Sequence, residues 1–369
     1  MNHGFFYKRQ HLVIIFNRFI RKLHLCLGLS CGLIASISGL TGSLYIWQPE
    51  ITSMLNPELL TIEHIKPFDE NLLYRTAYEL VEQHRDSLAK INLPYREQQT
   101  ISLVYKNGTT LYYHPISGHF LGEKSASIKF FENLLNFHRT MGIPKIGKYI
   151  TGSSTLLFLL LLLSSGIYLW WKTYSSNLIK GFKVKWSAKK KKLKLNYDLH
   201  KVLGASFFIP LMAIAFTGAY FTYSIYYKKV LSIFDDSEKT KLGQKEQTIG
   251  NAEPYQDYLR NPDKDYDLRA VILPKNMQDG YHFRYIQDRF LTAGLRKTKE
   301  LKIDQKGTIT SLTDFQIDSN SNRIAAQFYP VHIGEIGGLW GRVLVFISGL
   351  IPLTLYITGL SLFILKKKK

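Results

Sequence analysis

The sequence predicts a polytopic membrane protein: an all-α bundle of four transmembrane helices in two parallel-topology repeats, with two small α+β domains on one side. Three observations predict this class: four long apolar runs, basic residues on alternate sides of those runs, and a histidine–glycine pattern that occurs twice. A run of about 20 apolar residues is long enough to cross a hydrocarbon core about 30 Å thick. The four runs lie at about 25–47, 149–171, 203–223 and 339–365.

Lysine and arginine predict the orientation. They concentrate before the first run, after the second run and behind the fourth, and these places lie on one side of a four-span chain. Because cytoplasmic loops carry the excess of Lys and Arg, this side is expected to be cytoplasmic, with both termini on it. The formal net charge of +20 is therefore a topology signal. We expect the lipid bilayer, and no nucleic acid, as a partner.

The segments follow from these runs and from the local patterns between them. The apolar face of 70–85 predicts a helix, and the alternation around Asn107-Gly108 predicts a β-hairpin in the first outer segment. From about residue 268 a similar alternation predicts strands in the second outer segment, which we interpret as a second copy of the first. In chain order we expect a cytoplasmic amphipathic basic segment at 1–22, the first span at 23–48, an outer domain at 49–128, an approach helix and the second span at 129–171, a basic cytoplasmic loop at 172–197, the third span at 198–227, a second outer domain at 228–328, and the fourth span with a lysine tail at 329–369.

The first and third spans share one sequence motif. LHLCLGLSCGLIASISGLTG places Thr41 17 residues after His24 (41 − 24), and LHKVLGASFFIPLMAIAFTG places Thr217 17 residues after His200 (217 − 200). A glycine follows each threonine, and we expect these Thr-Gly pairs to serve helix packing. Both halves begin inside, so the repeats have parallel topology.

The second and fourth spans share another sequence motif. His138 and His332 each precede a Gly-Lys or Gly-Arg pair, and each span then ends in a hydroxyl residue plus glycine, with a one-residue slip between the copies. The chain is therefore a span, an outer domain and a span, twice over.

Four of the eleven histidines sit at a membrane boundary and recur by repeat. His24 and His200 open spans near the inner face, whereas His138 and His332 open spans near the outer face. A single interfacial histidine is commonly a headgroup or hydrogen-bonding residue, but a histidine near the apolar zone is costly without a partner. One pair at each face is the arrangement that axial ligation of two b-type haems requires, because each iron takes two neutral imidazoles. No C-x-x-C-H motif occurs, which argues against covalent haem attachment.

Neighbouring residues extend this hypothesis. Gly28 and Gly204 lie four residues after a histidine, on the same helix face, and would leave room for a flat macrocycle. The candidate partners of the haem propionates are Arg21 and Lys22 at the inner face, and Lys148 and Arg342 at the outer face.

The patterns LHLCLG…LTG, SGIYLWWK, LHKVLG…FTG and VHIGEIGGLWGRV…LYITGL resemble the PepSY-associated transmembrane family of bacterial inner-membrane proteins. The outer segments then look like PepSY domains, and LYYHPISGHFLG is similar to the final hairpin of that domain. Some members act as ferric-siderophore reductases with two b-type haems. The resemblance therefore implies haem ligation at His24, His138, His200 and His332, an inner-membrane location and periplasmic outer domains.

The expected function is electron transfer through two b-type haems to a ferric siderophore or another ferric chelate during iron uptake. The protein would then be a ferric-chelate reductase. A cytoplasmic flavin module, known in fusions of this family, does not follow the last span, so we expect quinol or a separate flavoprotein as the electron donor. Two alternatives stay open. The outer domains could bind or regulate a partner such as a peptidase without catalysis, or the chain could be a haem or metal permease.

Overall fold

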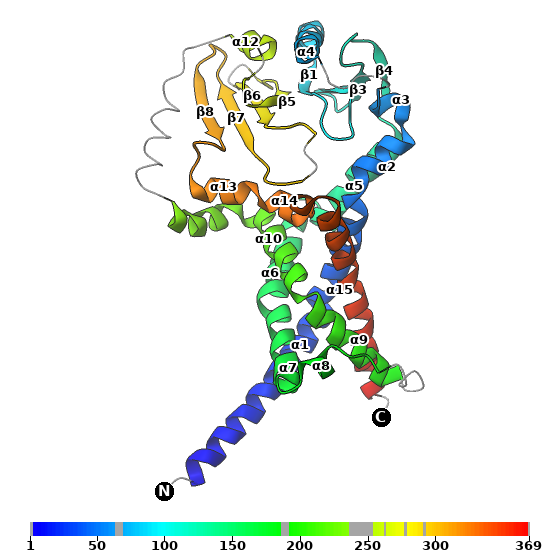
Figure 1. Cartoon of the computed structure of the whole chain (residues 1–369), viewed down its shortest axis with the longest axis vertical. Helices are drawn as coiled ribbons and strands as arrows, with labels where there is room; N and C mark the ends of the chain where they lie inside the picture. Colours follow the sequence, from blue (N-terminus) through cyan, green and yellow to red (C-terminus); the bar gives the residue numbers. More distant parts are fainter. Residues whose placement is uncertain are drawn as a thin grey trace.

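The computed structural model describes residues 3–62, 69–185, 192–235, 254–261, 263–276, 279–290 and 293–367, with side chains from residue 11 onward. A helical bundle carries a β-sheet at one end (Figure 1). We call this end of the bundle the sheet side and the opposite end the far side. Residues 186–191 of the basic loop at 172–197, and residues 236–253 of the segment at 228–328, lie outside the described residues.

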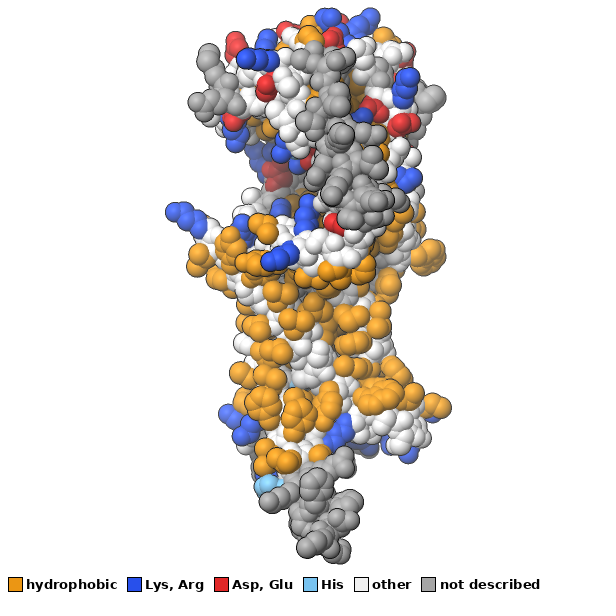
Figure 2. Space-filling model, turned by 90° about the vertical axis from the view of Figure 1, so that its left-hand side faces the viewer, with side chains coloured by type: hydrophobic (Ala, Val, Ile, Leu, Met, Phe, Trp, Pro, Cys, Tyr) orange, Lys and Arg blue, Asp and Glu red, His pale blue; other side chains and the backbone are white. Residues whose placement is uncertain are grey.

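The four predicted spans are confirmed. Among the described residues, four helical stretches are long and apolar enough to cross a membrane: His11–Ile46, Gly147–Tyr174, Phe208–Phe234 and Glu335–Lys367. Hydrophobic side chains cover the visible face of this bundle, whereas charged side chains gather on the sheet (Figure 2). This distribution is the one expected of a protein that crosses a bilayer with one polar domain outside it.

The first half of the chain forms one long helix and then a domain that leads into the second span. Its helices are α1 (His3–Ile46), α2 (Gln48–Leu55), α3 (Pro57–Leu60), α4 (Glu70–His84), α5 (Ala126–Thr140), α6 (Gly147–Leu157), the π-helix η1 (Phe158–Leu163) and α7 (Ser164–Tyr174). The helix predicted at 70–85 is α4. The amphipathic basic segment predicted at 1–22 is helical from residue 3 and is continuous with the first span, because α1 runs through both. No proline or glycine interrupts the chain between Gly4 and Gly28, so nothing ends the helix there.

The second half repeats this order with a break in its first span. Its helices are α8 (Leu178–Gly181), α9 (Lys192–Ser206), α10 (Phe208–Leu231), the 3₁₀-helix η3 (Ser232–Phe234), α12 (Tyr255–Arg260), α13 (Asn320–Ala326), α14 (Phe328–His332), the 3₁₀-helix η4 (Glu335–Gly337) and α15 (Gly338–Lys367). The break between α9 and α10 lies at Phe207, whose backbone angles (φ −99°, ψ 10°) are not helical. Pro210 explains it, because its ring clashes with the carbonyl of Ser206, four residues earlier.

The two outer segments, predicted as two small α+β domains, pair edge to edge into one sheet. The strands are β1 (Leu88–Asn92), β2 (Ile101–Tyr105), β3 (Thr110–Tyr113), β4 (Phe120–Glu123), β5 (Asp267–Ile272), β6 (Tyr281–Ile286), β7 (Thr298–Ile303) and β8 (Ile309–Asp314). In the described residues they make an eight-stranded antiparallel sheet in the order β4-β3-β2-β1-β5-β6-β7-β8. The halves join where Lys90 faces Ile272 and Asn92 faces Ala270. The predicted hairpin is β2 and β3, with Gly108 at φ +89° in its turn.

One core and one buried arginine hold the two halves of the sheet together. Leu73 of α4 and Leu259 of α12 pack in the same buried cluster as strand residues from both halves. Arg289, which is 1% exposed, donates hydrogen bonds to the carbonyls of Pro94 (3.0 Å) and Leu268 (3.3 Å). It also pairs with Glu70 at 2.7 Å. A buried charge needs such partners, so Arg289 ties the first half to the second.

Small residues let the first and fourth spans approach closely. A Cβ at Gly39 of α1 would lie 2.2 Å from the carbonyl oxygen of Gly349 of α15, which leaves no room for a side chain. Ser43 lies beside this contact and donates a hydrogen bond to the carbonyl of Phe346 at 2.8 Å. Close backbone approach through small residues is the usual way in which membrane helices pack.

The π-helix η1 explains the one-residue slip in the repeat. Ser165 follows His138 by 27 residues (165 − 138), whereas Thr358 follows His332 by 26 (358 − 332). A π-turn holds one residue more than an α-turn. The extra residue of the second span is therefore taken up within Phe158–Leu163, which ends two residues before Ser165.

Candidate functional site

Two histidine pairs lie in the bundle, one toward each end. The ring centres of His24 (α1) and His200 (α9) are 6.2 Å apart, with the ring planes at 86°. Those of His138 (α5) and His332 (α14) are 6.4 Å apart, with the planes at 57°. We call the first the far-side pair and the second the sheet-side pair. The structure thus brings together the four histidines in the two pairs predicted, and each pair takes one residue from each half of the chain.

Each imidazole forms a hydrogen bond through Nδ1 with a hydroxyl group of a neighbouring span. That hydroxyl donates its own hydrogen to a carbonyl in its own helix, at 3.0 Å for the serine and 2.8 Å for each threonine. The hydroxyl oxygen must therefore accept from Nδ1–H. The four bonds are His24 to Ser165 at 2.9 Å, His138 to Thr41 at 3.1 Å, His200 to Thr358 at 3.0 Å, and His332 to Thr217 at 3.1 Å.

Backbone carbonyls hold the sheet-side pair in the same way. Nδ1 of His138 lies 2.9 Å from the carbonyl oxygen of Ser38, and Nδ1 of His332 lies 3.1 Å from that of Ile214. A carbonyl can only accept, so Nδ1 carries the proton. In a neutral imidazole the lone pair is then on Nε2. This is the arrangement of metal-binding histidines, which donate their other N–H to the protein.

A glycine follows each hydroxyl residue and makes room for the imidazole. A Cβ at Gly42 would lie 2.9 Å from Cε1 of His138, and one at Gly218 would lie 3.0 Å from Cε1 of His332. The corresponding distances at Gly166 and Gly359 are 3.1 Å and 3.3 Å, to the far-side pair. Each hydroxyl–glycine pair, which the sequence analysis assigns to helix packing, therefore holds one histidine ring: the hydroxyl bonds Nδ1, and the glycine leaves space for Cε1. We call these four pairs the cradles. The sequence does contain a sign of this role, because a hydroxyl residue followed by glycine occurs at the end of each of the four spans.

The cradles show how each half of the chain is built. Within the first half, the first span orients the histidine that precedes the second span, and the second span orients that of the first. The second half repeats this reciprocal contact. Each pair then brings together histidine rings from different halves, so each candidate site lies on the interface between the halves.

The spacing of the rings fits a single metal ion between them. A metal bonds an imidazole nitrogen at about 2.0–2.1 Å, and that nitrogen lies about 1.1 Å from its ring centre, so two imidazoles on opposite sides of one metal have centres about 6.3 Å apart. The observed values are 6.2 Å and 6.4 Å. Together with the protonated Nδ1, this spacing suits axial ligation of a haem iron at each pair.

The chain matches the PepSY_TM family, the PepSY-associated TM region, over residues 21–366. It belongs to this family. The match includes both histidine pairs of this PepSY_TM protein and nearly all of its four spans. No curated protein matches the chain.

Gly28 and Gly204 leave open backbone beside the far-side pair of this PepSY_TM protein. A Cβ at Gly28 would come no closer than 3.9 Å to Leu162, and one at Gly204 no closer than 3.8 Å to Leu355. These glycines are therefore not required for contacts between the helices themselves. Their open surface is compatible with the predicted clearance for a flat ligand.

The four predicted propionate partners differ in availability. Arg342 is already engaged: it forms an ion pair with Glu50 and donates to the carbonyl of Ile46 at 2.6 Å. Lys148 is exposed and lies 4.8 Å from the ring centre of Tyr149. Arg21 and Lys22 are exposed on the far side.

Proposed function

We propose that this PepSY_TM protein is a di-haem b electron-transfer protein that reduces a ferric chelate, most readily a ferric siderophore, at its sheet side. The observation that carries the proposal is the geometry of the two histidine pairs, one toward each end of the bundle, with ring centres 6.2 Å and 6.4 Å apart. The two histidines of each pair would hold one haem, whose iron would accept and release one electron at a time.

The protein's own residues hold the imidazoles ready for this ligation. The hydroxyls of Thr41, Ser165, Thr217 and Thr358 accept from Nδ1–H, which fixes the tautomer and points Nε2 away from the cradle. The glycine beside each hydroxyl lets the ring lie against the helix. Such outer contacts raise the basicity of a histidine ligand and fix its orientation.

The distribution of charge supports an orientation. Arg18, Arg21 and Lys22 lie on the far side, as do Lys172 at the end of the second span and the lysines that end α15. By the positive-inside rule, the far side faces the cytoplasm and the sheet faces the periplasm of a bacterial inner membrane. Electrons would then enter from quinol or a separate flavoprotein and leave beside the sheet.

A ferric chelate is the acceptor that best suits such a path. Hard oxygen donors hold the small, highly charged Fe³⁺ far more tightly than Fe²⁺, so one electron is enough to loosen the complex. A one-electron donor on the outer side of the membrane would supply the single electron that reduces Fe³⁺ and so releases the iron from the chelate.

The test uses purified protein from cells grown with haem. We expect a bis-imidazole b-type spectrum, and we expect dithionite-reduced protein to reoxidise when a ferric chelate is added. His200→Ala is expected to remove one haem, whereas His119→Ala, at an exposed histidine of the sheet, should remove none. A colourless protein would favour the partner-binding role instead. A haem protein that no ferric chelate reoxidises would favour the permease.

A further inference from the structure

Three arginines converge between the sheet and the sheet-side pair. The guanidinium of Arg269 in β5 lies 4.2 Å from the ring centre of Tyr95, and that of Arg96 lies 4.8 Å from the same ring. Arg296, just before β7, lies 4.8 Å from the ring centre of Tyr329 in α14. A guanidinium stacked on an aromatic face is held in place without losing its N–H donors. We call these five residues the arginine pocket.

The charges of the arginine pocket are not balanced. Arg96 forms an ion pair with Glu335. Within the described residues, the guanidinium groups of Arg269 and Arg296 have neither a carboxylate partner nor a hydrogen-bond acceptor. Burial and the nearby charge of Arg296 lower the pKa of Arg269 to about 10. Two neighbouring half-buried cations with unused donors repel each other, and an anion bound between them would offset that repulsion.

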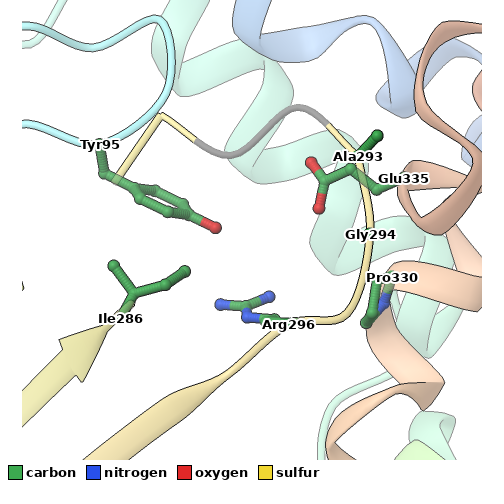
Figure 3. Close-up of a pocket in the computed structure, with 7 residues that line it drawn as sticks. All are labelled: Tyr95, Ile286, Ala293, Gly294, Arg296, Pro330 and Glu335. Carbon is green, nitrogen blue, oxygen red and sulfur yellow. The ribbon is translucent and has the colours of Figure 1, made fainter. Parts of the chain in front are cut away.

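A small cavity opens beside the guanidinium of Arg296. Its lining residues are Tyr95, Ile286, Ala293, Gly294, Arg296, Pro330 and Glu335. The hydroxyl of Tyr95 and the guanidinium of Arg296 point into the same gap, with Glu335 across it (Figure 3). The cavity holds about 10 Å³, enough for one water-sized polar group and too little for a whole chelate. It can therefore receive one anionic group of a larger ligand.

The position of the arginine pocket relates it to the sheet-side pair. Tyr329 and Pro330 precede His332 in the same short helix, α14, and Glu335 follows it in η4. A ligand held by the arginines would therefore lie beside the helix that carries His332. That is where a molecule must sit to exchange electrons with this pair.

We propose that the arginine pocket binds a carboxylate group of the acceptor, so that the preferred substrates are anionic ferric chelates of the carboxylate type. This inference rests on the proposed function and names its substrate class. Guanidinium groups recognise carboxylates through paired, charge-assisted hydrogen bonds. A haem propionate offers the same chemistry, so the experiment must separate the two sources.

The experiment compares Arg269→Gln and Arg296→Gln with Arg260→Gln. Arg260 is a matched control, because it lies 4.1 Å from the ring centre of Tyr78 at the other end of the sheet. The first measurement is calorimetric binding of gallium(III) citrate, which has the charge of a ferric chelate but is not reduced under these conditions. The second is reoxidation of dithionite-reduced protein by ferric citrate, an anion, and by ferrioxamine B, a cation.

We expect both pocket variants to weaken gallium citrate binding about tenfold or more, since a hydrogen bond to a charged group contributes about 1.5–3 kcal/mol. The concentration of ferric citrate that gives half the maximal rate should rise equally, with ferrioxamine B and haem content unchanged. Arg296→Lys, which keeps the charge, should recover part of the binding.

Three results would overturn the proposal: unchanged binding, an equal loss for both chelates, or a loss of haem with chelate binding intact, which would assign the arginines to a propionate. If wild-type protein is reoxidised by neither chelate, the proposed function fails, and gallium citrate binding still decides the ligand of the arginine pocket.

Discussion

Thr217 accepts a hydrogen bond from Nδ1 of His332 at 3.1 Å, although the two residues are 115 positions apart in the chain. The next residue, Gly218, lies against Cε1 of the same ring. One dipeptide therefore fixes both the tautomer and the position of an imidazole that belongs to another helix. The same relationship occurs at all four histidines, so the ligand geometry is built by pairs of spans.

Thr217→Val should weaken the sheet-side haem. Loss of an outer contact of a metal-binding histidine typically lowers affinity 10–100-fold, and we expect about tenfold because the carbonyl of Ile214 still accepts at 3.1 Å. The measurement is the transfer of haem to an excess of apomyoglobin. Thr173→Val is the control, because within the described residues that hydroxyl donates to the carbonyl of Leu169 in its own helix and to no other group. Equal transfer from wild type and Thr217→Val would argue against a cradle.

Gly42→Ala should displace the ring of His138, since the new Cβ would lie 2.9 Å from Cε1. We expect one haem per chain to be lost and the far-side haem to remain. Haem content by pyridine haemochrome assay measures this outcome. Gly337→Ala, where no atom lies within 4 Å of the new Cβ, should keep both haems. If Gly42→Ala also keeps both, Gly42 is not needed to seat His138.

Deletion of Leu161 should leave both haems in place. The deletion removes the extra residue of η1, and the second span then has the spacing of the fourth, so Ser165 keeps its register with His24. Deletion of Ile347 in α15 is the matched comparison, because Ile347 has a similar exposure, 42% against 39%. It would turn Thr358 by about 100° relative to the start of the helix, and we expect loss of the far-side haem. The same haem loss from both deletions would contradict this explanation of the slip.

Gly39→Ala should destabilise the whole bundle. Its Cβ would meet the carbonyl oxygen of Gly349 at 2.2 Å, and overpacking of this kind typically costs about 1–3 kcal/mol. Because α1 carries both His24 and Thr41, we expect a lower thermal midpoint together with weaker binding of both haems. Gly32→Ala, whose Cβ would lie 3.6 Å from Tyr356, should change the midpoint little. Equal midpoints for the two variants would show that this contact can relax.

The spans and the histidine pairs were predictable because they depend on local patterns. Apolar length identifies a span, and the repeated spacing from His24 and from His200 links histidines that lie far apart in the chain. Alternation around Asn107-Gly108 was likewise enough to predict a hairpin.

The remaining features depend on contacts that no local pattern encodes. Pairing of Lys90 with Ile272 joins the outer segments into one sheet, and each segment alone gives no sign of this partner. The arginine pocket collects residues from a loop, two strand ends and α14, so its members share no spacing. The role of the hydroxyl–glycine pairs was missed for another reason. A small residue beside glycine is also the pattern of simple helix packing.

The most direct test of the central claim is the haem content of paired histidine variants, measured by pyridine haemochrome assay on purified protein. Wild type should hold about two b-type haems per chain. The double variant His24→Ala/His200→Ala should hold one, because both changes fall on the same iron, whereas His24→Ala/His138→Ala should hold none. Equal haem content in the two double variants, or no haem in wild type, would contradict the account.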